Sequence, residues 1–200
     1  MSETAKIRNI PMWTISKRFK VSYAHRVFNQ DLLDSGMTPK CVSLHGHDST
    51  IVYRINASSL HNDMVLDYTL LKKKFFDQNG IFHAEELDHK LLLSTEDPKV
   101  KDILLMTGVS SDEADELIQK AKENEYYQFS RNGMRVILFP FVLTAENLSR
   151  FLYHQFLKLV NVLAEKYGIK NIDSVEVCFN ETDDTEACYS EFEVVVVDDN

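Results

Sequence analysis

The segment from Cys41 to His47 reads Cys-Val-Ser-Leu-His-Gly-His and concentrates side chains that bind metals. His45 and His47 are two residues apart at the start of a predicted strand, so both imidazoles would point to the same face of a sheet. His25 lies near the end of the preceding predicted strand, which a hairpin would bring opposite the pair. Three neutral imidazoles on one face can hold zinc and leave its fourth tetrahedral position open, as catalytic zinc sites do.

The same residues allow two other interpretations. Cys41 could join the three histidines as a fourth ligand, which would make a closed, structural zinc site. Alternatively, His45 and His47 could be surface histidines that bind nothing. The catalytic interpretation requires that the Cys41 thiol is not a permanent ligand of the metal.

Candidates for proton transfer and anion binding lie outside this segment. Asp88 and His89 are adjacent in the stretch Leu-Asp-His-Lys-Leu-Leu-Leu, and a carboxylate beside an imidazole can orient it for acid–base chemistry. Glu181 follows a predicted strand, in a polar turn where a single glutamate is ordinarily solvated. Arg26 and Lys40 are, by position only, the basic residues that could meet an anionic group.

Hydrophobic periodicity predicts the elements that must position these residues. The predicted strands are Thr14 to Val27, His47 to Ile55, Val175 to Asn180 and Cys188 to Val197, and the two main predicted helices are Tyr68 to Asp77 and Thr144 to Tyr167. A further helix over Ser111 to Asn124 would lie in an inserted segment, and Met134 to Phe141 is a β-rich apolar run. Asp67 and Thr144 are suited to cap helix starts, and Gly168 to end a helix. Hairpins at both ends with two helices between them predict an α+β domain. We expect an antiparallel four-stranded sheet with two helices packed on one face.

The domain organisation follows from length and composition. Two hundred residues, 44% of them hydrophobic, suffice for one domain with a core. We expect a leader over residues 1–13 and a single domain over residues 14–200. That domain would include an inserted, acidic and polar segment at about residues 97–131.

Charge and hydropathy exclude several classes of partner. The net charge of −9 argues against nucleic acid, because phosphate binding requires clustered Lys and Arg. No apolar stretch approaches the roughly 20 residues that span a bilayer. The three scattered cysteines, Cys41, Cys178 and Cys188, indicate free thiols in a reducing, cytoplasmic setting rather than a disulfide framework.

Six short motifs, taken together, resemble the 6-pyruvoyl- and 6-carboxytetrahydropterin synthase superfamily. They occur in the order typical of that family and reach from the first predicted strand to the last. They are Tyr23 to Val27 (YAHRV), Cys41 to His47 (CVSLHGH), Met64 to Lys72 (MVLDYTLLK), Leu87 to Leu92 (LDHKLL), Thr144 to Asn147 (TAEN) and Glu181 to Tyr189 (ETDDTEACY).

The resemblance implies a tunnelling fold whose trimers stack into a homohexamer, with active sites at subunit interfaces. It also implies that His25, His45 and His47 bind zinc and that Cys41 is the catalytic base.

The remaining motifs imply roles in proton transfer and in binding the pterin. Asp88 and His89 would act with the cysteine in proton transfer. Glu181 would anchor the pterin ring, where a carboxylate can accept two parallel N–H bonds. Thr144 and the neighbouring backbone would help to hold the same ring from an adjacent subunit.

The spacing of Cys41 is informative within the superfamily. Three residues separate it from His-Gly-His, which resembles the bacterial 6-carboxytetrahydropterin synthases, whereas the animal pyruvoyl enzymes carry a longer spacer. The implied lyase reaction converts 7,8-dihydroneopterin triphosphate to 6-carboxy-5,6,7,8-tetrahydropterin, acetaldehyde and triphosphate, on the route to 7-deazaguanines such as queuosine. The alternatives are a 6-pyruvoyltetrahydropterin synthase-type activity and a non-enzymatic structural zinc-binding domain.

Overall fold

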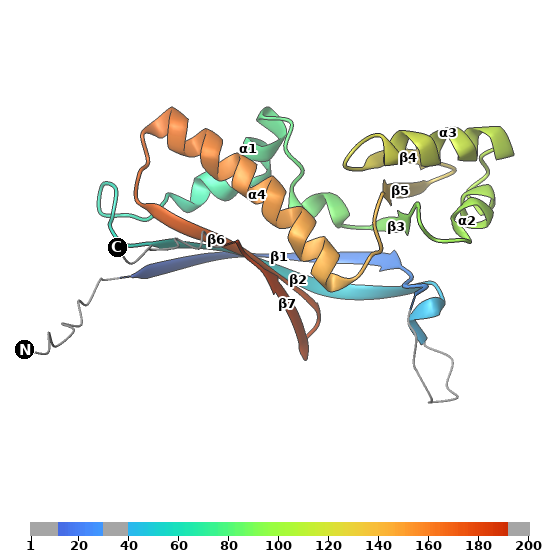
Figure 1. Ribbon diagram of the computed structural model, residues 1–200, viewed down its shortest axis with the longest axis horizontal. Helices are drawn as coiled ribbons and strands as arrows, with labels where there is room; N and C mark the ends of the chain where they lie inside the picture. Colours follow the sequence, from blue (N-terminus) through green and yellow to red (C-terminus); the bar gives the residue numbers. More distant parts are fainter. Residues whose placement is uncertain (1–11, 30–39, 192–200) are drawn as a thin grey trace, which may run out of the picture.

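The computed structural model of the chain describes residues 12–29 and 40–191. Its main feature is a twisted sheet of seven strands, with helices above it in the view of Figure 1. The strands are β1 (Trp13–His25), β2 (His45–Ala57), β3 (Lys90–Ser94), β4 (Tyr127–Arg131), β5 (Met134–Phe139), β6 (Ile172–Thr182) and β7 (Thr185–Tyr189). The α-helices are α1 (Lys73–Gln78), α2 (Val100–Met106), α3 (Ser111–Lys122) and α4 (Ala145–Tyr167). Of the expected leader and the expected last strand, residues 1–11 and 192–197 lie outside the described residues.

The four-stranded antiparallel sheet expected from the sequence is wrong for the sheet as a whole. Three expected strands are present as β1, β2 and β6, and β7 coincides with the fourth only at Cys188 and Tyr189; all of these strands are paired antiparallel. However, the full order is β4-β5-β3-β1-β2-β6-β7, and β3 runs parallel to both β1 and β5. Parallel neighbours need long crossover connections, so these pairings cannot be read from hairpin patterns in the sequence. The fold is α+β with a mixed sheet.

Helix α4 covers the β1–β2–β6–β7 part of the sheet, with α1 on the same side (Figure 1). The Thr144 hydroxyl accepts a hydrogen bond from the Asn147 N–H at 3.3 Å, and Gly168 ends the helix in the left-handed region at φ 66°. The predicted helix from Thr144 to Tyr167 is therefore confirmed. Its buried face packs in the main core with residues of the sheet, including Leu148, Leu152, Phe156, Leu159 and Leu163.

The helix predicted from Tyr68 to Asp77 is present in two pieces. Asp67 caps a 3-10 turn, η2 (Tyr68–Leu71), and α1 follows it. A second 3-10 turn of this region, η3 (Ala84–Leu87), leads into β3. A third, η1 (Lys40–Val42), precedes β2 and carries Cys41.

The expected inserted segment contains α2, α3 and β4, so it is more structured than its polar composition suggested. Its apolar residues form a second, smaller core with β3 and β5, which includes Leu104, Leu117 and Val136. The segment is also joined to β1 by an ion pair between Arg26 Nε and Asp97 Oδ2 at 3.1 Å, in which Asp97 is buried.

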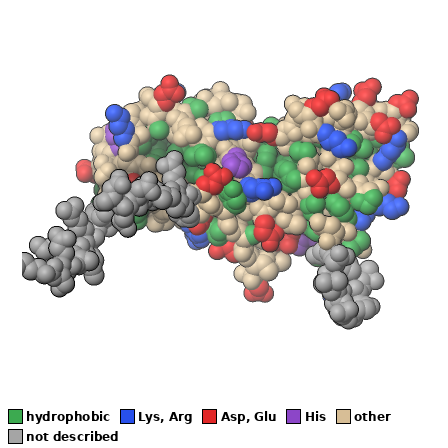
Figure 2. Space-filling view, viewed as in Figure 1, with side chains coloured by type: hydrophobic (Ala, Val, Ile, Leu, Met, Phe, Trp, Pro, Cys, Tyr) green, Lys and Arg blue, Asp and Glu red, His purple; other side chains and the backbone are tan. Residues whose placement is uncertain are grey.

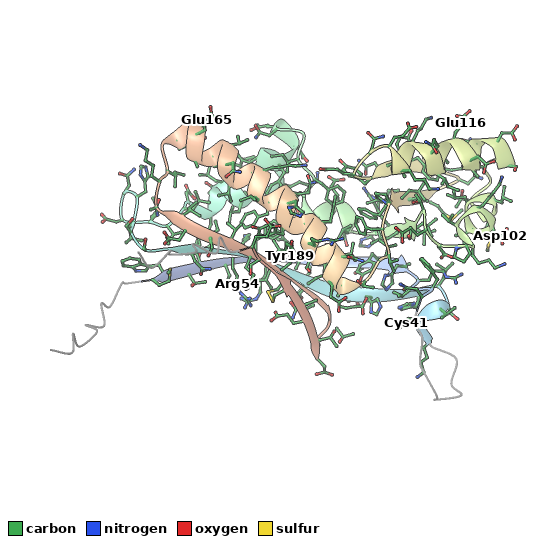
Figure 3. All side chains as sticks on the ribbon, viewed as in Figure 1. Cys41, Arg54, Asp102, Glu116, Glu165 and Tyr189 are labelled. Carbon is green, nitrogen blue, oxygen red and sulfur yellow. A yellow bond between two sulfur atoms is a disulfide. The ribbon has the colours of Figure 1, made fainter. Side chains whose placement is uncertain are left out.

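Cys178 and Cys188 form a disulfide, so the expected free thiols at these positions are a wrong prediction. The two residues are direct partners in the β6–β7 register, which places both side chains on one face of the hairpin. Arg54 Nη1 lies 2.8 Å from the Cys178 sulfur, on the side of the sheet away from α4 (Figure 3).

Charged side chains are spread over the outer surface. On the face shown in Figure 2, acidic and basic groups of the described residues are intermixed. None of the described helices is long and apolar enough to cross a lipid bilayer.

Candidate metal centre and active site

Three histidines meet at the end of the β1–β2 hairpin, on the face that α4 covers. The register pairs His25 directly with His45, and Tyr23 with His47. The ring centroids of His45 lie 4.7 Å from those of both His25 and His47, and the His25–His47 distance is 5.1 Å. Their nearest potential ligand atoms all lie within 4.8 Å of one another. The alternation of strand residues thus brings together the three side chains that the sequence singled out.

These imidazoles fit a metal ion such as zinc. Each has a buried Nε2 atom without a hydrogen-bond partner, and His25 is fully buried. Such orphaned polar atoms are costly unless a ligand satisfies them. His45 Nδ1 lies 2.8 Å from the Ser43 carbonyl oxygen, a contact that leaves Nε2 free to bind a metal. Burial lowers the pKa of His47, which favours the neutral form that metals require.

Glu181 is directed at the same place from β6. The β6–β7 register is irregular between Phe179 and Thr182, and such a bulge re-aims the side chain it carries. Glu181 Oε1 lies 3.3 Å from His25 Nε2 and 3.6 Å from His47 Nε2. The close contact with the His25 imidazole is the main cause that lowers the pKa of this carboxyl, so the carboxylate form is favoured.

Cys41 lines a cavity of about 460 Å³ beside this centre. Thr144, Glu146 and Glu181 line the same cavity, and Figure 3 shows Cys41 at the end of the sheet where α4 begins. Cys41 lies close to the end of β1, because the Val27 N–H donates a hydrogen bond to the Cys41 carbonyl at 2.8 Å. Among the described residues, the cluster of possible metal ligands at this place contains the three histidines without Cys41. The geometry therefore argues against a closed site in which Cys41 is a permanent fourth ligand.

Asp88 and His89 lie at a different place, on the opposite edge of β1. Asp88 Oδ1 accepts from the Ser22 N–H at 2.8 Å, and the His89 N–H donates to the Ser22 carbonyl at 2.6 Å. The two side chains contact each other, with Oδ2 2.8 Å from Nδ1. Burial alone would raise the pKa of Asp88, but the bonds from Ser22 and His89 lower it. The side chains are 41% and 67% exposed, and neither lines the cavity of Cys41.

Arg26 and Lys40 differ in how free they are to meet an anion. Arg26 is engaged by the buried Asp97 of the inserted segment. Lys40 is exposed at the start of η1, one residue before Cys41. Of the two, only the lysine has a charge that no described carboxylate pairs.

Tyr23 and Ser49 belong to this centre, although their types gave no reason to select them from the sequence. Tyr23 is buried, with its ring edge against His25 and its hydroxyl 3.5 Å from Glu181 Oε1. The Ser49 hydroxyl donates to the Glu181 carbonyl oxygen at 3.1 Å. Both stand at odd positions, like the histidines, so strand alternation was the available signal.

Comparison with protein families gives a match over most of the chain. The family model described as 6-pyruvoyl tetrahydropterin synthase matches residues 14–191. A curated relative from Aquifex aeolicus (strain VF5), named 6-carboxy-5,6,7,8-tetrahydropterin synthase, is 28% identical over 191 residues, covering 90% of this chain and 98% of the relative.

Solved structures share the fold at low sequence identity. An uncharacterized protein from Wolinella succinogenes has a TM-score of 0.62 at 22% identity, covering 91% of this chain and 99% of that one. The 6-pyruvoyltetrahydropterin synthase from Plasmodium vivax has a TM-score of 0.54 at 14% identity, covering 90% and 98%.

Proposed function

Because the chain belongs to the 6-pyruvoyl tetrahydropterin synthase family, we propose that it is a zinc-dependent 6-carboxy-5,6,7,8-tetrahydropterin synthase. The proposed reaction converts 7,8-dihydroneopterin triphosphate to 6-carboxy-5,6,7,8-tetrahydropterin, acetaldehyde and triphosphate. The observation that carries the proposal is the convergence of three unpartnered imidazole Nε2 atoms beside the residues that line the cavity of Cys41. A pathway leading to 7-deazaguanines of the queuosine type would use such a product.

Two observations support the carboxy-type reaction over the pyruvoyl type. The relative from Aquifex aeolicus has the name of a carboxy-type enzyme, and the match covers nearly the whole length of that relative. In addition, three residues separate Cys41 from His45, the short spacing that resembles the bacterial carboxy-type enzymes.

The proposed roles follow from the placement of each side chain. His25, His45 and His47 would hold the metal, which when bound supplies Lewis acidity toward the side-chain oxygens of the substrate. Cys41 would remove a proton from the substrate carbon chain, because its thiol borders the cavity next to the histidines.

The pterin ring would be held in the same cavity. Its amino and ring N–H groups form a paired donor edge, which a carboxylate can accept with two bonds. Glu181 is the proposed acceptor, and Thr144 at the start of α4 would contact the ring as well.

Asp88 and His89 are the proposed second half of the proton relay. Their exposure, and their position on the far edge of β1, suit a role in the site of a neighbouring subunit. We therefore propose a homo-oligomer, a trimer or hexamer, with active sites at subunit interfaces.

The decisive test is incubation of the purified protein with 7,8-dihydroneopterin triphosphate. We expect acetaldehyde and 6-carboxytetrahydropterin in equal amounts, from protein whose zinc content is measured in parallel. Formation of 6-pyruvoyltetrahydropterin without acetaldehyde would instead assign the pyruvoyl-type activity.

A variant at Cys41 separates the enzyme from a structural zinc domain. Cys41→Ala should keep its zinc and its fold while losing turnover, because the thiol lies outside the histidine cluster. Loss of zinc together with unfolding in this variant would show that the thiol is a structural ligand.

A further inference from the structure

Glu181 occupies a position that a role in pterin binding alone does not explain. It borders the cavity of Cys41, of about 460 Å³, and also a neighbouring cavity of about 630 Å³ lined by His47 and Lys20. Its carboxylate is turned toward the histidines rather than left in solvent, and its side chain is 27% exposed.

The distances from this carboxylate to His25 and His47 are those of a metal ligand, whereas the cluster of mutually close ligand atoms at this place contains the three histidines without Glu181. Tetrahedral zinc with bonds of about 2.0–2.2 Å separates neighbouring ligand atoms by about 3.3–3.5 Å. Glu181 Oε1 stands 3.3 Å from His25 Nε2 and 3.6 Å from His47 Nε2. Both Nε2 atoms lack any other hydrogen-bond partner. The oxygen is therefore close to a ligand position relative to two of the three imidazoles.

Neighbouring groups hold the carboxylate in this direction. The Tyr23 hydroxyl is 3.5 Å from the same Oε1 atom, and the buried Ser49 hydroxyl donates to the Glu181 carbonyl at 3.1 Å. The bulge in the β6–β7 pairing lies at this residue. The backbone is thereby fixed, while the side chain keeps its own torsions.

The proposed pterin contact needs both carboxylate oxygens at the ring edge. One oxygen cannot at once lie against the imidazoles and accept from the pterin. We propose that Glu181 closes the metal site as a fourth ligand in the substrate-free protein and is drawn away when the pterin binds. The second half of this inference rests on the proposed function, whereas the first half does not.

Metal affinity in the absence of substrate tests the first half. Protein stripped with a chelator is titrated with Zn²⁺ against a chromophoric competitor. We expect Glu181→Gln and Glu181→Ala to bind Zn²⁺ about 10-fold or more weakly, the scale seen when a supporting group at a metal site is lost. Asp183→Asn is the matched control, because it removes one exposed negative charge two residues away and should leave the affinity unchanged.

The visible absorption of the Co²⁺-loaded protein tests the position of the carboxylate directly, since these bands report ligand type and number. We expect Glu181→Ala to change the spectrum of the free protein. With saturating 7,8-dihydroneopterin, whose side-chain oxygens would then bind the metal, the spectra of wild type and variant should become alike, because Glu181 would contact the metal in neither. Circular dichroism of each variant verifies its fold.

The outcomes are distinguishable from those of the proposed function. Equal Zn²⁺ affinity and equal Co²⁺ spectra in wild type and both Glu181 variants would overturn the inference, even if the wild type produces acetaldehyde. Affinity and spectra that depend on Glu181, in a protein that forms no acetaldehyde, would uphold the fourth ligand and overturn the proposed function.

Discussion

The histidine at the start of β2 has one imidazole nitrogen against a backbone carbonyl and the other directed at its two partners. His45 Nδ1 lies 2.8 Å from the Ser43 oxygen, and Nε2 has no hydrogen-bond partner. Because His45→Ala removes one of the three proposed ligands, we expect zinc occupancy and turnover to collapse, as measured by elemental analysis and acetaldehyde formation. His154→Ala, on the exposed surface of α4, should keep full zinc. Full zinc in His45→Ala would mean that the metal site has been wrongly assigned.

His83 is a different kind of histidine, buried in the core away from the metal centre. Its ring packs edge-on against Phe19 and Phe76, each with ring centroids 4.5 Å away. Its Nδ1 accepts from the Glu85 N–H at 3.2 Å and caps η3. Burial lowers the pKa of His83 from 6.5 to about 4, because the charged imidazolium is disfavoured there.

This burial predicts an acid sensitivity of folding. Between pH 6.5 and 4 the unfolded chain binds a proton at His83 that the folded chain does not, so stability falls as pH decreases through this range. The loss amounts to up to about 3 kcal/mol. His83→Asn keeps an acceptor for the cap but cannot titrate. It should therefore show a smaller decrease, measured by urea unfolding at pH 7 and pH 4.5. Equal decreases in wild type and variant would contradict the assigned protonation.

At this scale, sequence reasoning found residue types but not their exact partners. Two-residue alternation was enough to place His25, His45 and His47 on one face, as the structure shows. Glu181 was assigned to a turn, because a bulge that re-aims one side chain leaves no periodic pattern. Tyr23 and Ser49 acquire their positions only through tertiary contacts with that glutamate.

Among the elements, the β6–β7 hairpin contains a disulfide where the sequence predicted free thiols. Its disulfide joins residues ten apart in sequence, so it restricts a short loop of the unfolded chain. Reduction should therefore lower the free energy of unfolding by about 2–3 kcal/mol at most. Thermal unfolding with and without reductant measures the effect, and Cys188→Ser, at the exposed end of the disulfide, should be insensitive to reductant. Identical melting of the wild type under both conditions would exclude a stabilising disulfide.

Elements with local signals were predictable, and those defined by long-range pairing were not. Thr144 and Gly168 mark the two ends of α4 through their own chemistry. In contrast, β3 is five residues long and pairs in parallel with strands remote in sequence. Strand β4 lies in the segment that was expected only to be inserted, acidic and polar. Both strands are specified by the second core rather than by their own pattern.

For the molecule as a whole, the two halves of the proposed proton relay lie at different places in the chain, because Asp88 and His89 do not line the cavity of Cys41. Asp88 and His89 are hydrogen-bonded to Ser22, whereas the Cys41 carbonyl is hydrogen-bonded to the Val27 N–H. Ser22 lies inside β1, whereas Val27 lies two residues beyond its end at His25. This arrangement supports the proposed homo-oligomer, in which a second copy would bring its own Asp88–His89 pair to the Cys41 cavity.

This arrangement predicts complementation between two inactive variants. Cys41→Ala and His89→Ala should each lack activity alone, yet regain it when they are unfolded together, mixed in equal amounts and refolded. With random assembly, about a quarter of the interfaces combine an intact Cys41 with an intact His89 from the neighbour, so about a quarter of wild-type turnover is expected. Size-exclusion chromatography would verify that each variant and the mixture form the same oligomer. A mixture that assembles fully but stays inactive would place both residues in the site of a single chain, against this arrangement.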